Sequence, residues 1–142
     1  MTAKPVTSAT PSMWFEDDLV VVRVVGEVGV TEMQRMIEMS DQLLARHGYI
    51  MLLADAQRAT GLHPDARKLQ AQRTKQVLGP SHVAIYHVNR ITRTIATLMQ
   101  RGIELVTSKS YPISFHRDEA EARGMLTSQR PILRARAARQ EK

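Results

Sequence analysis

The chain has 142 residues, of which 43% are hydrophobic and 24% charged, and it contains no cysteine. This length and balance predict one globular domain with a buried core, and the lack of cysteine excludes disulfides and thiolate metal sites. No apolar run approaches the roughly 20 residues of a membrane-spanning helix. The N-terminus lacks the apolar segment of a signal peptide, so we expect a cytoplasmic protein.

The formal net charge of +6 is concentrated at the C-terminal end. Residues 127–142 hold five basic residues and one acidic residue, which leaves 15 basic and 13 acidic residues elsewhere. Because no basic-aromatic surface or recognition-helix pattern accompanies this charge, we predict no dedicated nucleic-acid binding. A few positive charges beside Ile132 and Leu133 would give at most weak contact with a membrane surface.

The first part of the chain predicts a hairpin. Residues 1–12 are rich in proline, serine and threonine and are expected to be flexible. Residues 13–16 predict a short strand, and the β-branched run 19–25 predicts a second strand. Two aspartates between them are typical of a turn, so the two strands are expected to pair antiparallel.

A helix and a buried strand follow the hairpin. Thr31 with Gln34 forms a capping-box pattern that predicts the start of a helix, and Gly48 predicts its end. The apolar run 50–54 leads into Asp55 without a polar interruption. Such a run is typical of a strand that is buried on both faces of a sheet.

The remaining elements alternate between helices and strands. After a polar loop around Thr60 and Gly61, Pro64 is predicted to open a helix to residue 78. The predicted elements that follow are a strand at 83–87, a helix from Asn89 to Gly102, an edge strand at 111–115 and a short helix at 118–126.

This order predicts an α/β fold. We expect a mixed, mostly parallel sheet of about five strands, with an N-terminal hairpin and about four helices. Residues 50–54 should lie in the middle of the sheet. The expected division is a flexible segment at 1–12, a domain at 13–126 and a basic tail at 127–142. The tail is expected to be disordered, with a short basic helix after Pro131 as the alternative.

The pattern resembles SpoIIAA-like proteins of the STAS superfamily, which includes the anti-sigma-factor antagonists. Three segments carry the resemblance: L-V-V-V-R-V-V-G-E-V at 19–28, M-L-L-A-D at 51–55 and Y-P-I-S-F-H-R-D-E-A-E-A at 111–122. The resemblance covers roughly residues 13–126. It implies a regulatory, non-enzymatic module without a cofactor that binds a protein partner. The fold is also similar to that of CRAL-TRIO lipid-transfer domains.

In the antagonists, a serine or threonine at the start of the helix after the central strand is phosphorylated, within a D-S-S-G or D-S-T-G motif. The matching residues here are 63–66, H-P-D-A, which contain no hydroxyl group, and the nearest hydroxyl is that of Thr60. Asp65 would instead present a permanent negative charge. The predicted partner-binding residues are Asp55, Thr60, Gly61, His63, Asp65, Arg67 and Lys68.

The sequence also permits other binding sites and another function. A weaker ligand-binding set at the expected carboxyl ends of the strands comprises His87, Asn89, Arg90 and His116. Their spacing matches no metal motif, and no serine sits in a nucleophile elbow, so we predict neither a metal nor an enzyme. The alternative function is binding of a lipid or other small apolar ligand beside the methionine-rich first helix. An apolar edge at Met13 and Phe15 would permit a homodimer.

Overall fold

The computed structural model describes residues 12–76, 79–90, 93–94, 97, 100–101 and 112–140. These residues form β1 (Ser12–Glu16), β2 (Leu19–Val28), α1 (Val30–His47), β3 (Ile50–Leu62), α2 (Pro64–Gln76), β4 (Ser81–Tyr86), β5 (Ile113–His116) and α4 (Glu119–Gln140). The strands pair in the order β1-β2-β3-β4-β5. The β1–β2 pair is antiparallel and the other pairs are parallel, which confirms the predicted mixed α/β sheet.

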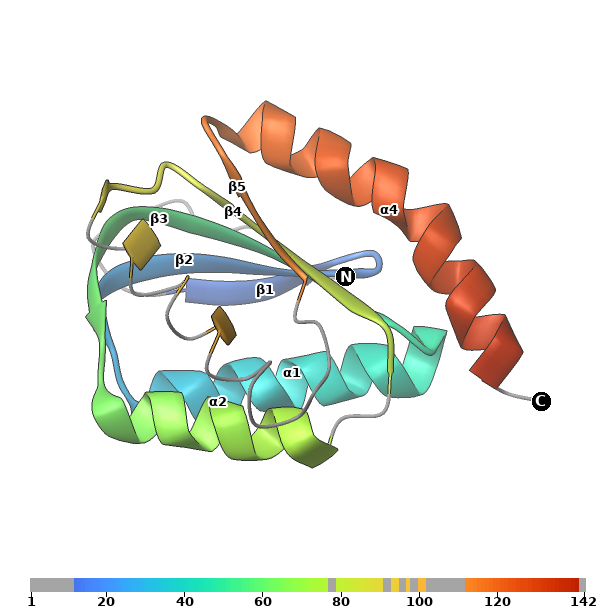
Figure 1. The fold of residues 1–142 in the computed structure, drawn as a ribbon, viewed down its shortest axis with the longest axis horizontal. Helices are drawn as coiled ribbons and strands as arrows, with labels where there is room; N and C mark the ends of the chain where they lie inside the picture. The colour runs from blue at the N-terminus through green and yellow to red at the C-terminus, as the bar shows by residue number, and fades with distance from the viewer. Residues whose placement is uncertain are drawn as a thin grey trace.

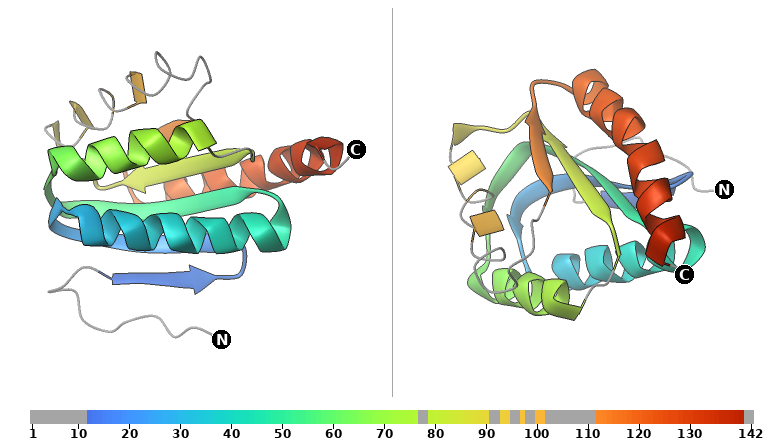
Figure 2. Two further views of the ribbon diagram at one scale, coloured as in Figure 1. Left: turned by 90° about the horizontal axis from the view of Figure 1, so that it is seen from below. Right: turned by 45° about the vertical axis from the view of Figure 1, so that its right-hand side comes forward.

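Helices cover both faces of the sheet (Figures 1 and 2). The alternation of side chains along β2 explains this arrangement, since Val20 and Val22 join the core under α1 whereas Val21 joins the core under α4. α2 packs mainly beside α1, and an ion pair between Arg73 and Asp41 links the two helices. Residues 50–54 lie in the central strand, as predicted.

Helix α1 begins earlier than predicted. Gly29 is its N-cap, and the Gly29 N–H donates to the Glu32 carboxylate at 3.4 Å. The first backbone bond of the helix joins the Met33 N–H to the Gly29 carbonyl at 3.0 Å. The predicted capping box of Thr31 with Gln34 is therefore wrong, because both residues lie inside the helix and the N-cap N–H of Gly29 is satisfied by Glu32 instead.

Strand β3 is much longer than predicted. Residues 56–62, expected as a loop, continue the strand because the end of β2 runs beside them, with Val25 opposite Arg58 and Val28 opposite Leu62. Irregularities in the β2–β3 pairing lie next to Gly26, whose φ of 74° suits glycine. Figure 1 shows β3 bending toward α2 at this end. Thr60 and Gly61 thus lie on a paired strand.

Helix α4 is also longer than predicted. The expected short helix ending near Leu126 continues to Gln140, through Pro131. Leu133 and Ala137 explain the continuation, because both are buried in the core against the sheet. This packing outweighs the backbone hydrogen bond that a proline inside a helix cannot make. The prediction of a disordered tail is therefore wrong for residues 127–140.

The two edges of the sheet differ from each other. β5 forms one edge, as the proline before it predicts. β1 forms the other edge, where Met13 is buried and the Arg46 guanidinium lies 5.4 Å from the centre of the Phe15 ring. The exposed apolar edge that we expected at Met13 is therefore not present.

Some predicted segments fall outside the described residues. These are residues 1–11, most of the predicted helix at 89–102, and Tyr111 at the start of the last predicted strand. The described strand β4 begins at Ser81, two residues before the predicted start, and ends at Tyr86. His87 follows with a φ of 56°, which is incompatible with continuing the strand.

Candidate functional site

The junction between β3 and α2 is held by His63. Its backbone N–H donates to the Val28 carbonyl at 2.9 Å, which ties the junction to the end of β2. Its ring Nδ1 accepts the Asp65 N–H at 3.0 Å, and its carbonyl accepts the Arg67 N–H at 3.0 Å. His63 therefore caps α2 and satisfies an N–H group that the first turn leaves without a helical partner.

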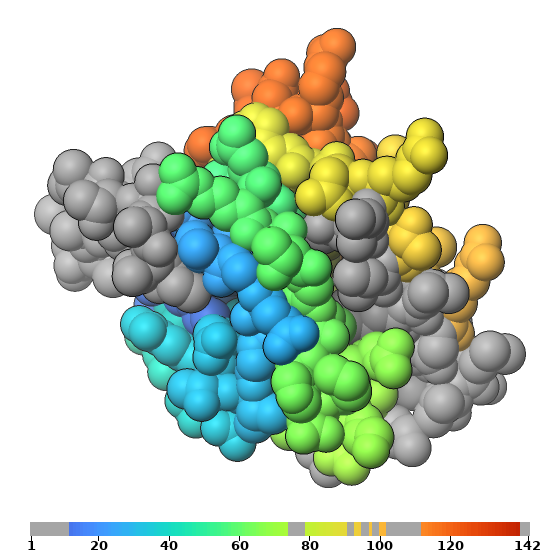
Figure 3. Space-filling view, turned by 90° about the vertical axis from the view of Figure 1, so that its left-hand side faces the viewer, coloured from blue at the N-terminus to red at the C-terminus, as the bar shows by residue number. Residues whose placement is uncertain are grey.

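Most of the predicted partner-binding residues form one exposed surface at this junction. Thr60, Asp65, Arg67 and Lys68 are exposed, and Gly61 and His63 are half-buried. Figure 3 shows that the end of β3 and the start of α2 form a continuous surface on this side of the molecule. We call these six residues the β3–α2 surface.

Ala66 anchors the β3–α2 surface to the rest of the fold. It is fully buried, while its neighbours Asp65 and Arg67 are exposed. The surface thus presents a carboxylate and two basic side chains from the first turns of a capped helix. A negative charge near a helix N-terminus is also favourable toward the helix dipole.

Asp55 does not belong to this surface. Because β3 continues to Leu62, Asp55 and His63 are separated by roughly 25 Å of extended chain. The Asp55 carboxylate is 20% exposed, accepts the Gln57 N–H at 3.0 Å and lies 3.5 Å from His87 Nδ1. The seven predicted partner-binding residues therefore lie in two places, with Asp55 beside His87 and the other six on the β3–α2 surface.

The weaker ligand-binding set does not converge on one point in the described residues. Asp55, Tyr86 and His116 occupy neighbouring register positions on β3, β4 and β5. His87 contacts Asp55, whereas His116 contacts Ser114 and Glu121. Asn89 and Arg90 are exposed at the beginning of the next segment. The predicted set is therefore split between two places. His87 lies beside Asp55, and His116 lies with Ser114 and Glu121.

Two polar clusters that the sequence did not reveal join α4 to the sheet. In the first, the Tyr86 hydroxyl donates to Glu119 at 3.3 Å, and Arg123 binds both Glu119 and Glu16 at 2.7 and 2.8 Å. Burial raises the pKa of Tyr86, and the negative charges of Asp55 and Glu119 raise it further. The i, i+4 spacing of Glu119 and Arg123 was the only signal in the sequence.

The second cluster lies toward the C-terminal half of α4. Arg130 donates two hydrogen bonds to the buried Asp18 carboxylate, at 2.6 and 2.9 Å. The Tyr49 hydroxyl donates to the same carboxylate at 2.7 Å, and Arg134 donates to the Tyr49 oxygen at 3.3 Å. Burial alone would raise the pKa of Asp18, but the hydrogen bonds from Arg130 and Tyr49 outweigh it and leave this pKa below its usual value.

A small hollow lies between β2 and α1. Met13, Val22, Val25 and Met36 line it, with a volume of about 10 Å³ that has room for about one water molecule. Met33 and Met39 of α1 are buried in the core. This hollow gives no support to the alternative of a lipid or apolar ligand.

Two further properties concern metals and membranes. Among the described residues, no group of three or more histidine, aspartate or glutamate side chains could hold a metal ion. Across the described part of the chain, no helix combines the length and apolar character needed to cross a membrane.

The fold matches solved structures at low sequence identity. The structure of the anti-sigma factor antagonist SpoIIAA in its unphosphorylated form matches with a TM-score of 0.55 and 12% identity, over 83% of this chain and 98% of that chain. An uncharacterized protein with a SpoIIAA-like fold from Shewanella loihica PV-4 matches with a TM-score of 0.49 and 19% identity, over 89% of this chain and 99% of that chain. No protein-family model and no curated protein matches the chain. The chain therefore has a SpoIIAA-like fold.

Proposed function

We propose that this chain is a regulatory module that binds a protein partner through the β3–α2 surface. The fold is shared with SpoIIAA, an anti-sigma factor antagonist, which is a protein that acts on another protein. The observation that carries the proposal is the exposed and charged first turn of α2 beside the exposed end of β3. The proposal involves no catalytic step and no cofactor.

The geometry of the β3–α2 surface suits recognition of a folded partner. Hydrogen bonds from Asp65 and Arg67 to His63 hold the start of α2 in one conformation, and buried Ala66 anchors it. Side chains on a preorganised element lose less entropy on binding than side chains on a loose loop. A rigid surface at this junction can therefore bind with a modest contact area.

The charges indicate the chemistry of the partner. Arg67 and Lys68 are adjacent and exposed, so a complementary surface would offer carboxylates to them. Asp65 would favour a hydrogen-bond donor or a positively charged group on the partner, next to these carboxylates. Charged groups at the margin of an interface mainly increase the rate and selectivity of association.

A site-specific crosslink tests the proposal in cells that naturally produce the chain. A photo-crosslinking residue placed at Lys68 should give a covalent adduct with one protein, and Arg67→Glu should abolish it. The matched control places the crosslinker at Arg136, an exposed arginine on α4. We expect no such adduct there, and Arg136→Glu should leave the Lys68 adduct unchanged. An adduct at Lys68 that survives Arg67→Glu, or the same adduct at both positions, would contradict the proposal.

A further inference from the structure

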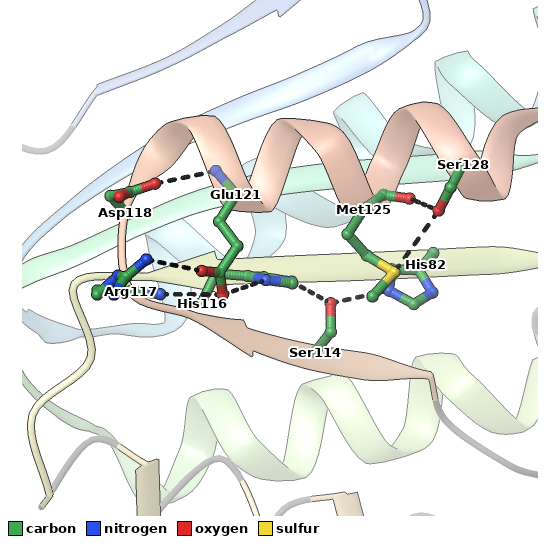
Figure 4. Close-up of polar contacts among 8 residues, drawn as sticks. All are labelled: His82, Ser114, His116, Arg117, Asp118, Glu121, Met125 and Ser128. Atoms are coloured by element: carbon green, nitrogen blue, oxygen red, sulfur yellow. Dashed lines mark hydrogen bonds and ion pairs between the residues drawn. The ribbon is translucent and has the colours of Figure 1, made fainter.

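Four polar side chains connect β4, β5 and α4 in a line (Figure 4). His82 Nε2 lies 2.9 Å from Ser114 Oγ, and His116 Nε2 lies 2.7 Å from the same oxygen. His116 Nδ1 lies 3.3 Å from Glu121 Oε1 on α4. His82 is buried and the His116 side chain is only 6% exposed, so water has little access to the two rings, whereas the Glu121 side chain is 46% exposed.

The hydrogen-bond chemistry assigns a direction to this line when both rings are neutral. The Glu121 carboxylate only accepts, so His116 carries its hydrogen on Nδ1 and its Nε2 accepts from the Ser114 hydroxyl. The Ser114 oxygen then accepts from His82 Nε2–H. Every donor in the line has an acceptor, so the neutral state is fully satisfied.

One added proton is accommodated without a break. When His116 is protonated, both its ring nitrogens donate, one of them to the Glu121 carboxylate as an ion pair. Ser114 then accepts from His116 and turns its own hydrogen toward His82 Nε2, which requires the hydrogen of His82 to move to Nδ1. The direction of the line is reversed, and both contacts of Ser114 with the rings are kept.

A second proton cannot be accommodated in the same way. With both rings charged, His82 and His116 would each direct an N–H at the single Ser114 oxygen, and the Ser114 hydroxyl would have no ring nitrogen to donate to. Two like charges would then flank one oxygen atom in a buried place. Burial lowers the pKa of His82 from its usual value of 6.5, and the charge of His116 lowers it further.

The charged groups around His82 do not offset this repulsion. Its register neighbour on β3 is apolar Met51, and β5 presents His116. On α4, Glu121 faces His116 and is shared with Arg117, at 3.8 Å. Glu119 and Arg123 of the same helix pair with each other beside Tyr86.

From this geometry we propose that His82, Ser114 and His116 form a pH-sensitive latch between the sheet and α4. The latch keeps β5 and the first turns of α4 on the sheet near neutral pH, and it weakens when both imidazoles are protonated. The unfolded chain binds the proton of His82 more readily than the folded chain does. Stability is therefore fully present above the usual histidine pKa and is lost as pH falls below it.

The same side chains occur in the order serine, histidine and carboxylate, which is also the order of hydrolase triads. Here the Ser114 oxygen also contacts the His82 ring, and the hydroxyl lies between the edge strand and α4. A hydroxyl that is hydrogen-bonded to two rings in this position is less available for attack on a substrate.

Hydrogen exchange at about pH 7 and about pH 5, corrected for intrinsic rates, tests the latch. We expect the protection of amides in residues 119–128 to fall at the lower pH, because the pKa of His82 is lowered on folding and the contribution of its neutral ring is lost as pH falls. Protection in α1 should stay unchanged. In His82→Gln, whose amide can still bond to Ser114 but cannot become charged, protection of 119–128 should not depend on pH.

The control variant is His47→Gln, which removes an exposed histidine of α1 outside the latch. It should retain the full pH dependence at 119–128. Equal protection at both pH values in the wild type, or the same loss in His82→Gln, would overturn the proposal. Should His82→Gln fail to fold, NMR titration of the wild-type rings decides: His82 must titrate below 6.5, and its midpoint must rise in His116→Gln.

Discussion

The two faces of the sheet are built in different ways. The core under α1 is apolar throughout and consists of Met13, Val20, Val22, Met39, Leu43 and Ala54. The face under α4 also has an apolar core, but polar clusters surround it, such as Asp18 with Arg130 and Tyr86 with Glu119. One helix is held mainly by burial of apolar surface, and the other by burial together with directed hydrogen bonds.

This difference shows which interactions determine the position of each helix. Burial of apolar surface is not directional, so a suitable spacing of apolar residues is enough to place α1. α4 needs particular partners that lie far away in the chain, such as Asp18 for Arg130, 112 residues later. Removing such a partner leaves a buried polar group unsatisfied, which costs more than the pair contributes.

The largest expected effect tests whether the second half of α4 belongs to the core. Leu133 is 2% exposed and Leu43, under α1, is 0% exposed. Leu133→Ala should therefore lower the free energy of unfolding by about 2–5 kcal/mol, as should Leu43→Ala. Urea denaturation measures both. Ile132→Ala is the control because this neighbour is 47% exposed, and its effect should be within about 0.5 kcal/mol. Equal effects of Leu133→Ala and Ile132→Ala would contradict the packing of α4.

The next effect concerns the charge pair under α4. Asp18→Asn should cost about 1.5–3 kcal/mol of unfolding free energy, because Arg130 and Tyr49 lose a charged acceptor. Asp17→Asn is a matched control, since Asp17 is exposed and its φ of 52° is tolerated by asparagine. A similar loss of stability in both variants would show that the turn, and not the pair, is responsible.

The same pair predicts a pH dependence in acid. Because the pKa of Asp18 is lowered on folding, its stabilising contribution is present above the usual value of 3.8 and is lost as pH falls through the folded pKa. The difference in unfolding free energy between wild type and Asp18→Asn should therefore shrink below about pH 4. Urea denaturation across this range measures it, and a constant difference would be inconsistent with the lowered pKa.

A smaller effect tests the contact of α4 with the end of α1. Gly48 has a φ of 80°, and a Cβ added there would lie 3.0 Å from the Ala137 Cβ. Gly48→Ala should cost about 1–2 kcal/mol for the left-handed backbone, plus a contact penalty. Gly26→Ala has a similar φ of 74° but nothing within 4 Å of the added carbon, so it isolates the backbone cost. Thermal denaturation should show the larger loss for Gly48→Ala, and equal losses would place Ala137 away from Gly48.

The smallest effect concerns the phenol of Tyr86. Tyr86→Phe removes one hydrogen bond to Glu119 and should cost about 0.5–1.5 kcal/mol. In a spectrophotometric alkaline titration, Glu119→Gln should lower the raised pKa of Tyr86 toward its usual value of 10.0, because it removes a nearby negative charge. A titration curve that is unchanged in Glu119→Gln would show that the carboxylate does not influence the phenol.

The candidate surface was predictable only in part. The start of α2 at Pro64, and the exposure of Asp65 and Lys68, follow from local signals in the sequence. The position of Asp55 away from this surface does not follow from local signals, because residues 56–62 have the local sequence pattern of a loop. They form a strand only because the end of β2 lies beside them and supplies the hydrogen bonds.

By itself, the sequence determined the order of the strands and helices that the structure describes, and the central position of residues 50–54. These follow from apolar spacing and from glycine and proline, which act within a few residues. Only the tertiary structure decided the length of β3, the continuation of α4 through Pro131 and the grouping of His82, Ser114 and His116. Each of these depends on a hydrogen-bond partner or a packing surface from another segment, which local patterns cannot show.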